Sequence, residues 1–234
     1  MKGKYEQSGV AVTCRGYEEY VRMFDLGESE LSKGDILDVA AGASSFTADG
    51  RVRGLRTFAA DPRYAKSPEA LTGEAREEIA VSTAKLEGLK ELFDYSYYGS
   101  LDNHRAMREA SLGRFAEDYG RSDRGDRYFA ASLPALPFED GRFGLVLCSH
   151  FLFLYGEQFG YDFHRDAALE LLRVCKPGGQ VRIYPLSTLG FRRYPDLGRL
   201  MEHLSVLGYA CGRTETRLPF IPGSSEILTI GCPE

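Results

Sequence analysis

The chain has 234 residues, 43% of them hydrophobic, which is enough to bury one sizeable core, and no linker-like stretch divides it. A formal net charge of −5 argues against a dedicated nucleic-acid binder, because nonspecific affinity comes from many Lys and Arg contacts to phosphates. No apolar run could span a bilayer, the start does not resemble a signal peptide, and five scattered cysteines indicate neither a disulfide framework nor a zinc site. We therefore expect one cytoplasmic domain without a membrane partner.

Residues 35–46 combine a buried strand, a tight turn of small residues and the start of a helix. Asp38 stands at the end of that strand, and of the three glycines typical of a dinucleotide loop only Gly42 is present. A pyrophosphate needs bare N–H groups, whereas a cationic ligand needs a carboxylate at the strand end. The segment therefore predicts a nucleotide-type pocket for a cationic ligand.

A second strand is expected at residues 55–60, after a helix over 46–53, and it ends at Asp61. An acidic residue roughly 20 residues past the loop is placed to accept hydrogen bonds from both ribose hydroxyls. The alternative is that Asp61 only caps the turn before Pro62.

Two long helices are expected between the second and third strands. Ser67 followed by Pro68 indicates the start of a helix that runs to about Phe93, and Ser100 indicates the start of the next. This insertion, at about 65–127, is longer than a usual crossover and is interpreted as a cap over the active-site edge. The N-terminal segment, at about 1–33, is interpreted as a lid.

The remaining elements alternate between strands and helices. Strands are expected at 127–131, 145–147 and 180–184, a helix ends near Val174, and a final helix at 197–207 precedes an antiparallel pair at 214–219 and 226–231. His150 follows the strand at 145–147 directly.

Together these segments resemble the class I S-adenosylmethionine (SAM) methyltransferases from about residue 36 to 231, least of all over 64–127. Motif I appears as Asp38-x-Ala40-x-Gly42-x-Ser44, and a Leu-Pro-Phe segment at 136–138 and a Lys-Pro-Gly-Gly turn at 176–179 also match. The resemblance implies an α/β, Rossmann-like, doubly wound and mostly parallel seven-stranded sheet with an antiparallel C-terminal strand.

The resemblance also implies a SAM site. Asp38 and the Gly42 loop would hold the methionine portion, and Asp61 would hold the ribose. Ala40 and Ser44 depart from the family glycines: Ala40 adds a methyl group, and the Ser44 hydroxyl is able to cap the helix. The remaining cofactor contacts are expected from Ser132, which replaces the acidic residue usually found near the adenine, and from Leu133 and Ser149.

His150 is the candidate general base, since a histidine can take a proton from an oxygen or nitrogen nucleophile; a purely structural role is the alternative. His164, on or near a helix start, is a weaker candidate that could equally cap that helix or face solvent. The residues expected on the substrate side are Tyr98, Asn103, Tyr155 and His164.

The predicted function is methylation of an O or N nucleophile on a small molecule, with no metal, because the metal-binding aspartate of catechol-type enzymes is absent. One alternative is transfer or intramolecular capture of the aminocarboxypropyl arm of SAM, which releases methylthioadenosine. A second is a non-catalytic SAM-binding regulator or subunit. The substrate and the oligomeric state stay open.

Overall fold

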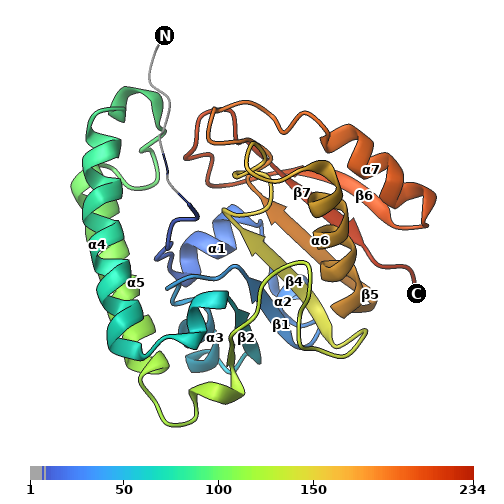
Figure 1. The fold of residues 1–234 in the computed structure, drawn as a ribbon, viewed down its shortest axis with the longest axis horizontal. Helices are drawn as coiled ribbons and strands as arrows, with labels where there is room; N and C mark the ends of the chain where they lie inside the picture. Colours follow the sequence, from blue (N-terminus) through green and yellow to red (C-terminus); the bar gives the residue numbers. More distant parts are fainter. Residues whose placement is uncertain (1–6, 8) are drawn as a thin grey trace.

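A computed structural model describes residue 7 and residues 9–234 (Figure 1). Its centre is a seven-stranded sheet in the order β3-β2-β1-β4-β5-β7-β6, in which β7 runs antiparallel to both of its neighbours. This confirms the predicted fold class. The strands are β1 (Ile36–Val39), β2 (Thr57–Ala60), β3 (Tyr128–Phe129), β4 (Phe143–Ser149), β5 (Cys175–Tyr184), β6 (Ala210–Glu215) and β7 (Glu226–Gly231).

Helices cover both faces of the sheet because successive side chains of the central strands point to opposite sides. Leu37 packs into a core shared with α6 and α7, whereas Ile36 packs with α1 and α3. Asp38 therefore points to the same side as Ile36. The helices are α1 (Tyr17–Met23), α2 (Glu28–Leu31), α3 (Phe46–Val52), α4 (Pro68–Glu87), α5 (Leu101–Tyr119), α6 (Tyr161–Val174) and α7 (Leu197–Val206), with short 3₁₀ turns η1 (Pro62–Ala65), η2 (Lys90–Leu92) and η3 (Arg124–Asp126).

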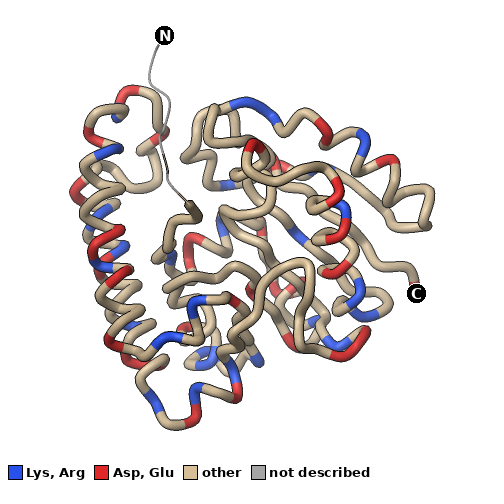
Figure 2. Tube along the Cα trace, in the orientation of Figure 1, with Lys and Arg blue, Asp and Glu red and all other residues tan. Residues whose placement is uncertain are grey.

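The two inserted helices, α4 and α5, lie side by side along one side of the molecule, and residues 9–16 pass between them and the sheet (Figure 1). Both predicted N-caps are confirmed: the Ser67 hydroxyl accepts from Ala70 N–H, and the Ser100 hydroxyl accepts from Asn103 N–H. A third buried cluster joins this hairpin to the sheet edge, and it includes Val12, Cys14, Ala43, Leu71, Ile79, Leu112 and Phe115. Charges of both signs are interspersed along the hairpin (Figure 2).

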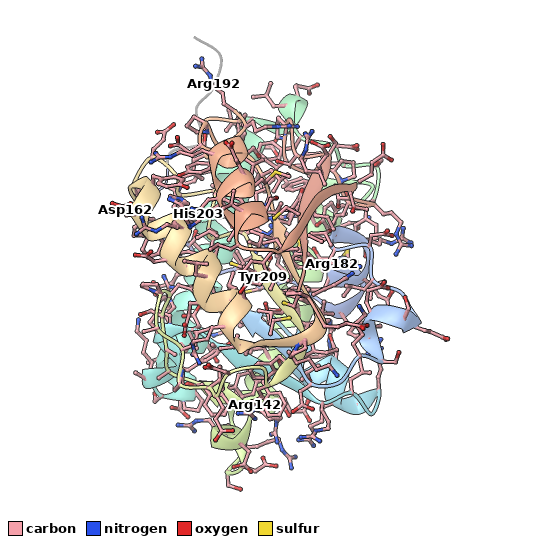
Figure 3. The ribbon with its side chains drawn as sticks, turned by 90° about the vertical axis from the view of Figure 1, so that its right-hand side faces the viewer. Arg142, Asp162, Arg182, Arg192, His203 and Tyr209 are labelled. Carbon is pink, nitrogen blue, oxygen red and sulfur yellow. The ribbon has the colours of Figure 1, made fainter. Side chains whose placement is uncertain are left out.

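The N-terminal helix α1, within the segment expected to form a lid, packs into the core. Tyr20 is fully buried and stacks on Phe46 with ring centroids 4.6 Å apart. Arg182 of β5, labelled in Figure 3, donates to the carbonyl oxygens of Phe24 and Asp25 at 2.6 and 2.9 Å and so fixes the turn after α1. The beginning of the expected lid, residues 1–6 and 8, lies outside the described residues.

Three predicted boundaries were wrong. The helix from Ser67 ends at Glu87, and η2 covers part of the stretch expected to continue it to Phe93. The strand expected at 127–131 is reduced to two residues in β3. The strand expected at 214–219 is β6 at Ala210–Glu215, and its mostly exposed side chains give no alternating apolar pattern to mark it.

Candidate functional site

The loop after β1 keeps a left-handed backbone at two of the three motif I glycine positions, although two of those glycines are replaced. Ala40 and Gly42 adopt φ of 57° and 59°, in the left-handed region that favours glycine. Ser44 does not share this conformation. Its hydroxyl accepts from Phe46 N–H at 3.1 Å, so the expected capping role at the start of α3 is confirmed.

Asp38 is a buried carboxyl group without a hydrogen-bond partner among the described residues. Its relative exposure is 0%, and neither of its oxygens has a partner. The Tyr20 hydroxyl lies beside it but outside hydrogen-bonding geometry. Burial therefore raises the pKa of Asp38 well above its usual range. Such an orphaned acid fits a cationic partner, as the ammonium group of a bound amino acid would be.

Asp61 uses both of its carboxyl oxygens within the protein. One accepts from Gly42 N–H at 3.0 Å, and the other accepts from Arg63 N–H at 2.9 Å. The turn-capping alternative for Asp61 is therefore observed. The same side chain also holds the motif I loop, so Asp61 connects the ends of β1 and β2.

Residues 10–15, which we call the N-terminal strap, lie directly on this loop. The carbonyl oxygen of Thr13 accepts from Ala43 N–H at 2.9 Å, and that of Arg15 accepts from Ser45 N–H at 3.1 Å. A Cβ atom on Gly42 would come within 3.0 Å of the main chain of Thr13. The strap therefore takes up the hydrogen-bonding groups that the loop would otherwise present to a ligand.

A cavity of about 110 Å³ lies along the strap. Neither Asp38 nor Asp61 lines it. Its walls come from the strap, the α4–α5 hairpin, the segments that follow β4 and β5, and the loop before β7: Ala11, Val12, Thr13, Cys14, Arg15, Glu78, Ile79, Ser82, Leu86, Phe93, His104, Arg108, His150, Leu154, Tyr155, Leu189, Phe191, Phe220 and Ile221.

His150 reaches the cavity from a left-handed backbone position with φ of 52°. Its Nδ1 accepts a hydrogen bond from Arg15 Nε at 3.2 Å and lies 2.8 Å from the Ser149 hydroxyl. Burial, followed by the charge of Arg15, lowers the pKa of His150 well below its usual range. Because its basic nitrogen is already engaged and protonation is disfavoured, this arrangement argues against the expected role as general base.

A second buried cluster on the cavity wall centres on Arg108. Its guanidinium binds the Glu19 carboxylate at 2.5 and 2.7 Å and donates to His104 Nε2 at 3.1 Å. The Tyr98 hydroxyl donates to Glu19 at 2.7 Å. Burial alone would raise the pKa of Glu19, but the charges of Arg108 and Arg15 outweigh it and lower that pKa. Burial lowers the pKa of His104 to about 2.

The sequence did not single out Arg15, Glu19 or Arg108 as site residues. Glu19 and Arg108 are 89 positions apart, and neither belongs to a local motif. The signal that exists is indirect: His104 and Arg108 share one face of α5 four residues apart, which a helical pattern could have suggested.

Two residues expected on the substrate side do not line this cavity. Asn103 is exposed on α5 and does not line the cavity, whereas its neighbour His104 does. His164 is fully buried in α6, with each ring nitrogen 2.9 Å from a carbonyl oxygen, one of Gly160 and one of Leu152. His164 therefore does not face solvent, and its ring is held by main-chain groups at the start of α6 and before it.

The other expected residues occupy three different surroundings. Tyr155 lines the cavity, and its hydroxyl accepts from Ala11 N–H at 2.8 Å. Tyr98 is buried behind the wall in the Arg108 cluster. Ser132 is exposed, and Leu133 is buried in the core on the α6 face, so neither lines this cavity.

Within residues 7 and 9–234, no group of three or more His, Cys, Asp or Glu side chains is arranged to hold a metal ion. In the same part of the chain, no helix is long and apolar enough to cross a membrane.

Comparison with known proteins identifies the family. A family profile described as "Methyltransferase domain" matches residues 81–183, a range that begins inside α4 and leaves out Asp38 and Asp61. An uncharacterised protein, MJ0045 from Methanocaldococcus jannaschii, is 31% identical over 217 residues, which are 92% of this chain and 93% of that protein. The chain thus carries a methyltransferase domain over residues 81–183 and belongs to the same family as MJ0045.

Similar solved structures share low sequence identity with the chain. The PH0226 protein from Pyrococcus horikoshii is 15% identical with a TM-score of 0.48, and the match covers 93% of this chain and 91% of that one. An O-methyltransferase family protein from Burkholderia thailandensis is 16% identical with a TM-score of 0.46, over 88% of this chain. The chain spans about half of that protein, 54% of its length.

Proposed function

We propose that this methyltransferase acts on an O or N nucleophile of a small molecule that binds in the cavity beside the strap. The observation that carries the proposal is the size and enclosure of that cavity, about 110 Å³ between the α4–α5 hairpin and the segments after β4 and β5. Ligand sites in open α/β sheets lie at the carboxyl ends of the strands, where these segments begin. A cavity of this kind suits a small molecule better than a polymer.

For the cofactor, we propose that Asp38 binds the ammonium group of the methionine portion. The support is the orphaned, buried carboxyl group, whose desolvation an adjacent positive charge would offset. Asp61 is proposed to hold the ribose, and Ser132 and Leu133 are proposed to lie at the adenine edge. SAM supplies an electrophilic methyl group, so the protein's own contribution is to position and desolvate the acceptor.

We infer that the strap changes its contacts when SAM binds. The loop N–H groups of Ala43 and Ser45 are occupied by the carbonyl oxygens of Thr13 and Arg15, and Thr13 lies against Gly42. A ligand seated on the loop needs part of that space. The α4–α5 hairpin and the strap together are proposed to act as the cap and the lid of the site.

We propose that His150 serves as a hydrogen-bond donor to the acceptor and not as a base. The Arg15 guanidinium donates to Nδ1, which leaves the ring proton on Nε2 in the neutral imidazole. The acceptor then has to reach the site as a nucleophile that needs no strong base, or has to lose its proton to water.

The test is to incubate the protein with SAM and a small-molecule extract and to identify both products by mass. S-adenosylhomocysteine together with an acceptor heavier by one methyl group is the expected result. Methylthioadenosine would replace the proposal with transfer or cyclisation of the aminocarboxypropyl arm. SAM that binds in calorimetry but never turns over would favour a regulator.

A further inference from the structure

Arg15 is a buried cation without a carboxylate partner in the described part of the chain. Its exposure is 7%, and the one hydrogen bond made by its guanidinium goes from Nε to a neutral histidine. Other buried or half-buried arginines here are paired, as Arg108 is with Glu19 and Arg182 is with Glu30. Since buried charges are normally paired or bind ligands, the exception requires an explanation.

The acidic residues near the cavity do not neutralise this charge. Glu19 is bound to Arg108, so two guanidinium groups share a single carboxylate and one positive charge is left over. Glu78 also lines the cavity, but within the described residues it forms no ion pair with Arg15, and one of its carboxyl oxygens is buried without a hydrogen-bond partner. The Arg15 end of the cavity therefore carries a net positive charge.

Three polar groups that line the cavity each have a proton free to donate. His150 accepts from Arg15 at Nδ1 and so carries its proton on Nε2. Tyr155 accepts from Ala11 N–H, which leaves its hydroxyl proton to donate. His104 likewise accepts from Arg108 at Nε2, and its buried Nδ1 has no partner within the described residues.

The rest of the cavity is largely apolar. Aromatic and aliphatic side chains from four separate segments face it: Ile79, Leu86, Phe93, Leu154, Phe191 and Phe220. A ligand that fills this space has to present an apolar body to these walls and hydrogen-bond acceptors to Arg15.

We propose that the methyl acceptor is an apolar or aromatic small molecule that carries a carboxylate, and that Arg15 binds this carboxylate. The inference rests on the proposed function, because it names the substrate class of the same cavity. A single unpaired guanidinium balances a monoanion, whereas a phosphate monoester, with a charge near −2 at neutral pH, would leave excess negative charge. Arg15 would thus be a specificity-determining residue.

The test compares two matched probes, phenylacetate and its uncharged amide, phenylacetamide, by calorimetry in the presence of S-adenosylhomocysteine. We expect the wild-type protein to bind the acid about tenfold more tightly than the amide, or better, because only the acid forms a charged hydrogen bond with Arg15. The preference should disappear in Arg15→Gln and persist in Arg15→Lys. Arg105→Gln is the matched control, because Arg105 is exposed on α5 and lies outside the cavity.

Binding of SAM is measured separately for every variant, which keeps the two proposals apart. If Arg15→Gln binds SAM about tenfold more weakly and still prefers the acid, Arg15 pairs with the cofactor's own carboxylate and the inference is wrong. Equal binding of acid and amide to the wild type, or binding of neither, also overturns it. A wild-type protein that prefers the acid but forms no S-adenosylhomocysteine would support the carboxylate site and refute the proposed function.

Discussion

Replacement of Asp38 by Asn should stabilise the ligand-free protein while it abolishes cofactor binding. The carboxyl group is fully buried, and its two oxygens have no partner among the described residues. Leaving such a group unsatisfied costs about 1–3 kcal/mol, and more when it is charged. The amide is nearly isosteric and uncharged, so we expect the free energy of unfolding to rise by about 1–3 kcal/mol at pH 8.

The pH dependence of this difference has a definite sign. Burial raises the folded-state pKa of Asp38, so the folded protein holds the proton more tightly than the unfolded chain. Its contribution to stability is therefore fully present below the ordinary aspartate pKa of about 4 and is lost as the pH rises toward the folded-state value. The advantage of Asp38→Asn over the wild type should accordingly be smallest near pH 4 and should grow with increasing pH.

Urea unfolding followed by circular dichroism, with and without SAM, tests both parts. At a SAM concentration of 1,000 times Kd the wild type should gain about 4.1 kcal/mol, whereas the variant should gain nothing. The order of stability then reverses when SAM is added. Asp126→Asn, at an exposed position in η3, is the control and should be neutral in both conditions. An Asp38→Asn protein less stable than the wild type at pH 8 would refute the reasoning.

Three further outcomes are expected. Glu19→Gln should lower the free energy of unfolding in urea by about 3–5 kcal/mol, because Arg108 loses its buried partner, and a loss below about 1 kcal/mol would contradict the buried pair. Gly42→Ala should destabilise the protein by at least about 1–2 kcal/mol, because residue 42 has a positive φ and lies against the strap. The control Gly113→Ala, in open space on α5, should stabilise it by about 0.5–1 kcal/mol. Equal melting temperatures of the two variants would argue against the contact between Gly42 and Thr13. The rate of turnover should not fall as the pH drops through about 6.5, because the pKa of His150 lies well below its usual range. A fall at about pH 6.5 that is absent in His150→Gln would show that His150 acts as a general base.

Local patterns predicted most of the individual strands and helices because those signals are short in range, whereas the seven-stranded sheet followed from the family resemblance. The caps at Ser67 and Ser100 depend on three or four neighbouring residues, and the buried β1 is a continuous apolar run around Asp38. β6 was misplaced by four residues at its start because mostly exposed strand residues carry no apolar alternation.

The candidate site was predicted only in part because its charges are paired across long distances in the chain. Tyr155 was found at the cavity from its place after β4, but Asn103 was chosen one residue away from the inward-facing His104. Arg15 and His150 are 135 positions apart in the sequence, and no local sequence pattern predicts their hydrogen bond. The donor that sets the tautomer of His150, the Arg15 guanidinium, was therefore identified only from the structure.

The departure of the motif I loop from the family pattern at Ser44 has a physical reason in the strap. Ser44 gives up the conformational freedom of glycine, but its hydroxyl donates to the carbonyl oxygen of Arg15 at 2.8 Å. Glycine is required at position 42, because a Cβ atom there would lie only 3.0 Å from the main chain of Thr13. The loop therefore holds the strap and, through Ser44, fixes the main chain of Arg15, whose side chain places a positive charge in the cavity. Contacts that a glycine-rich loop would reserve for the cofactor here also position Arg15, so cofactor binding and acceptor binding are expected to be coupled through residues 10–15.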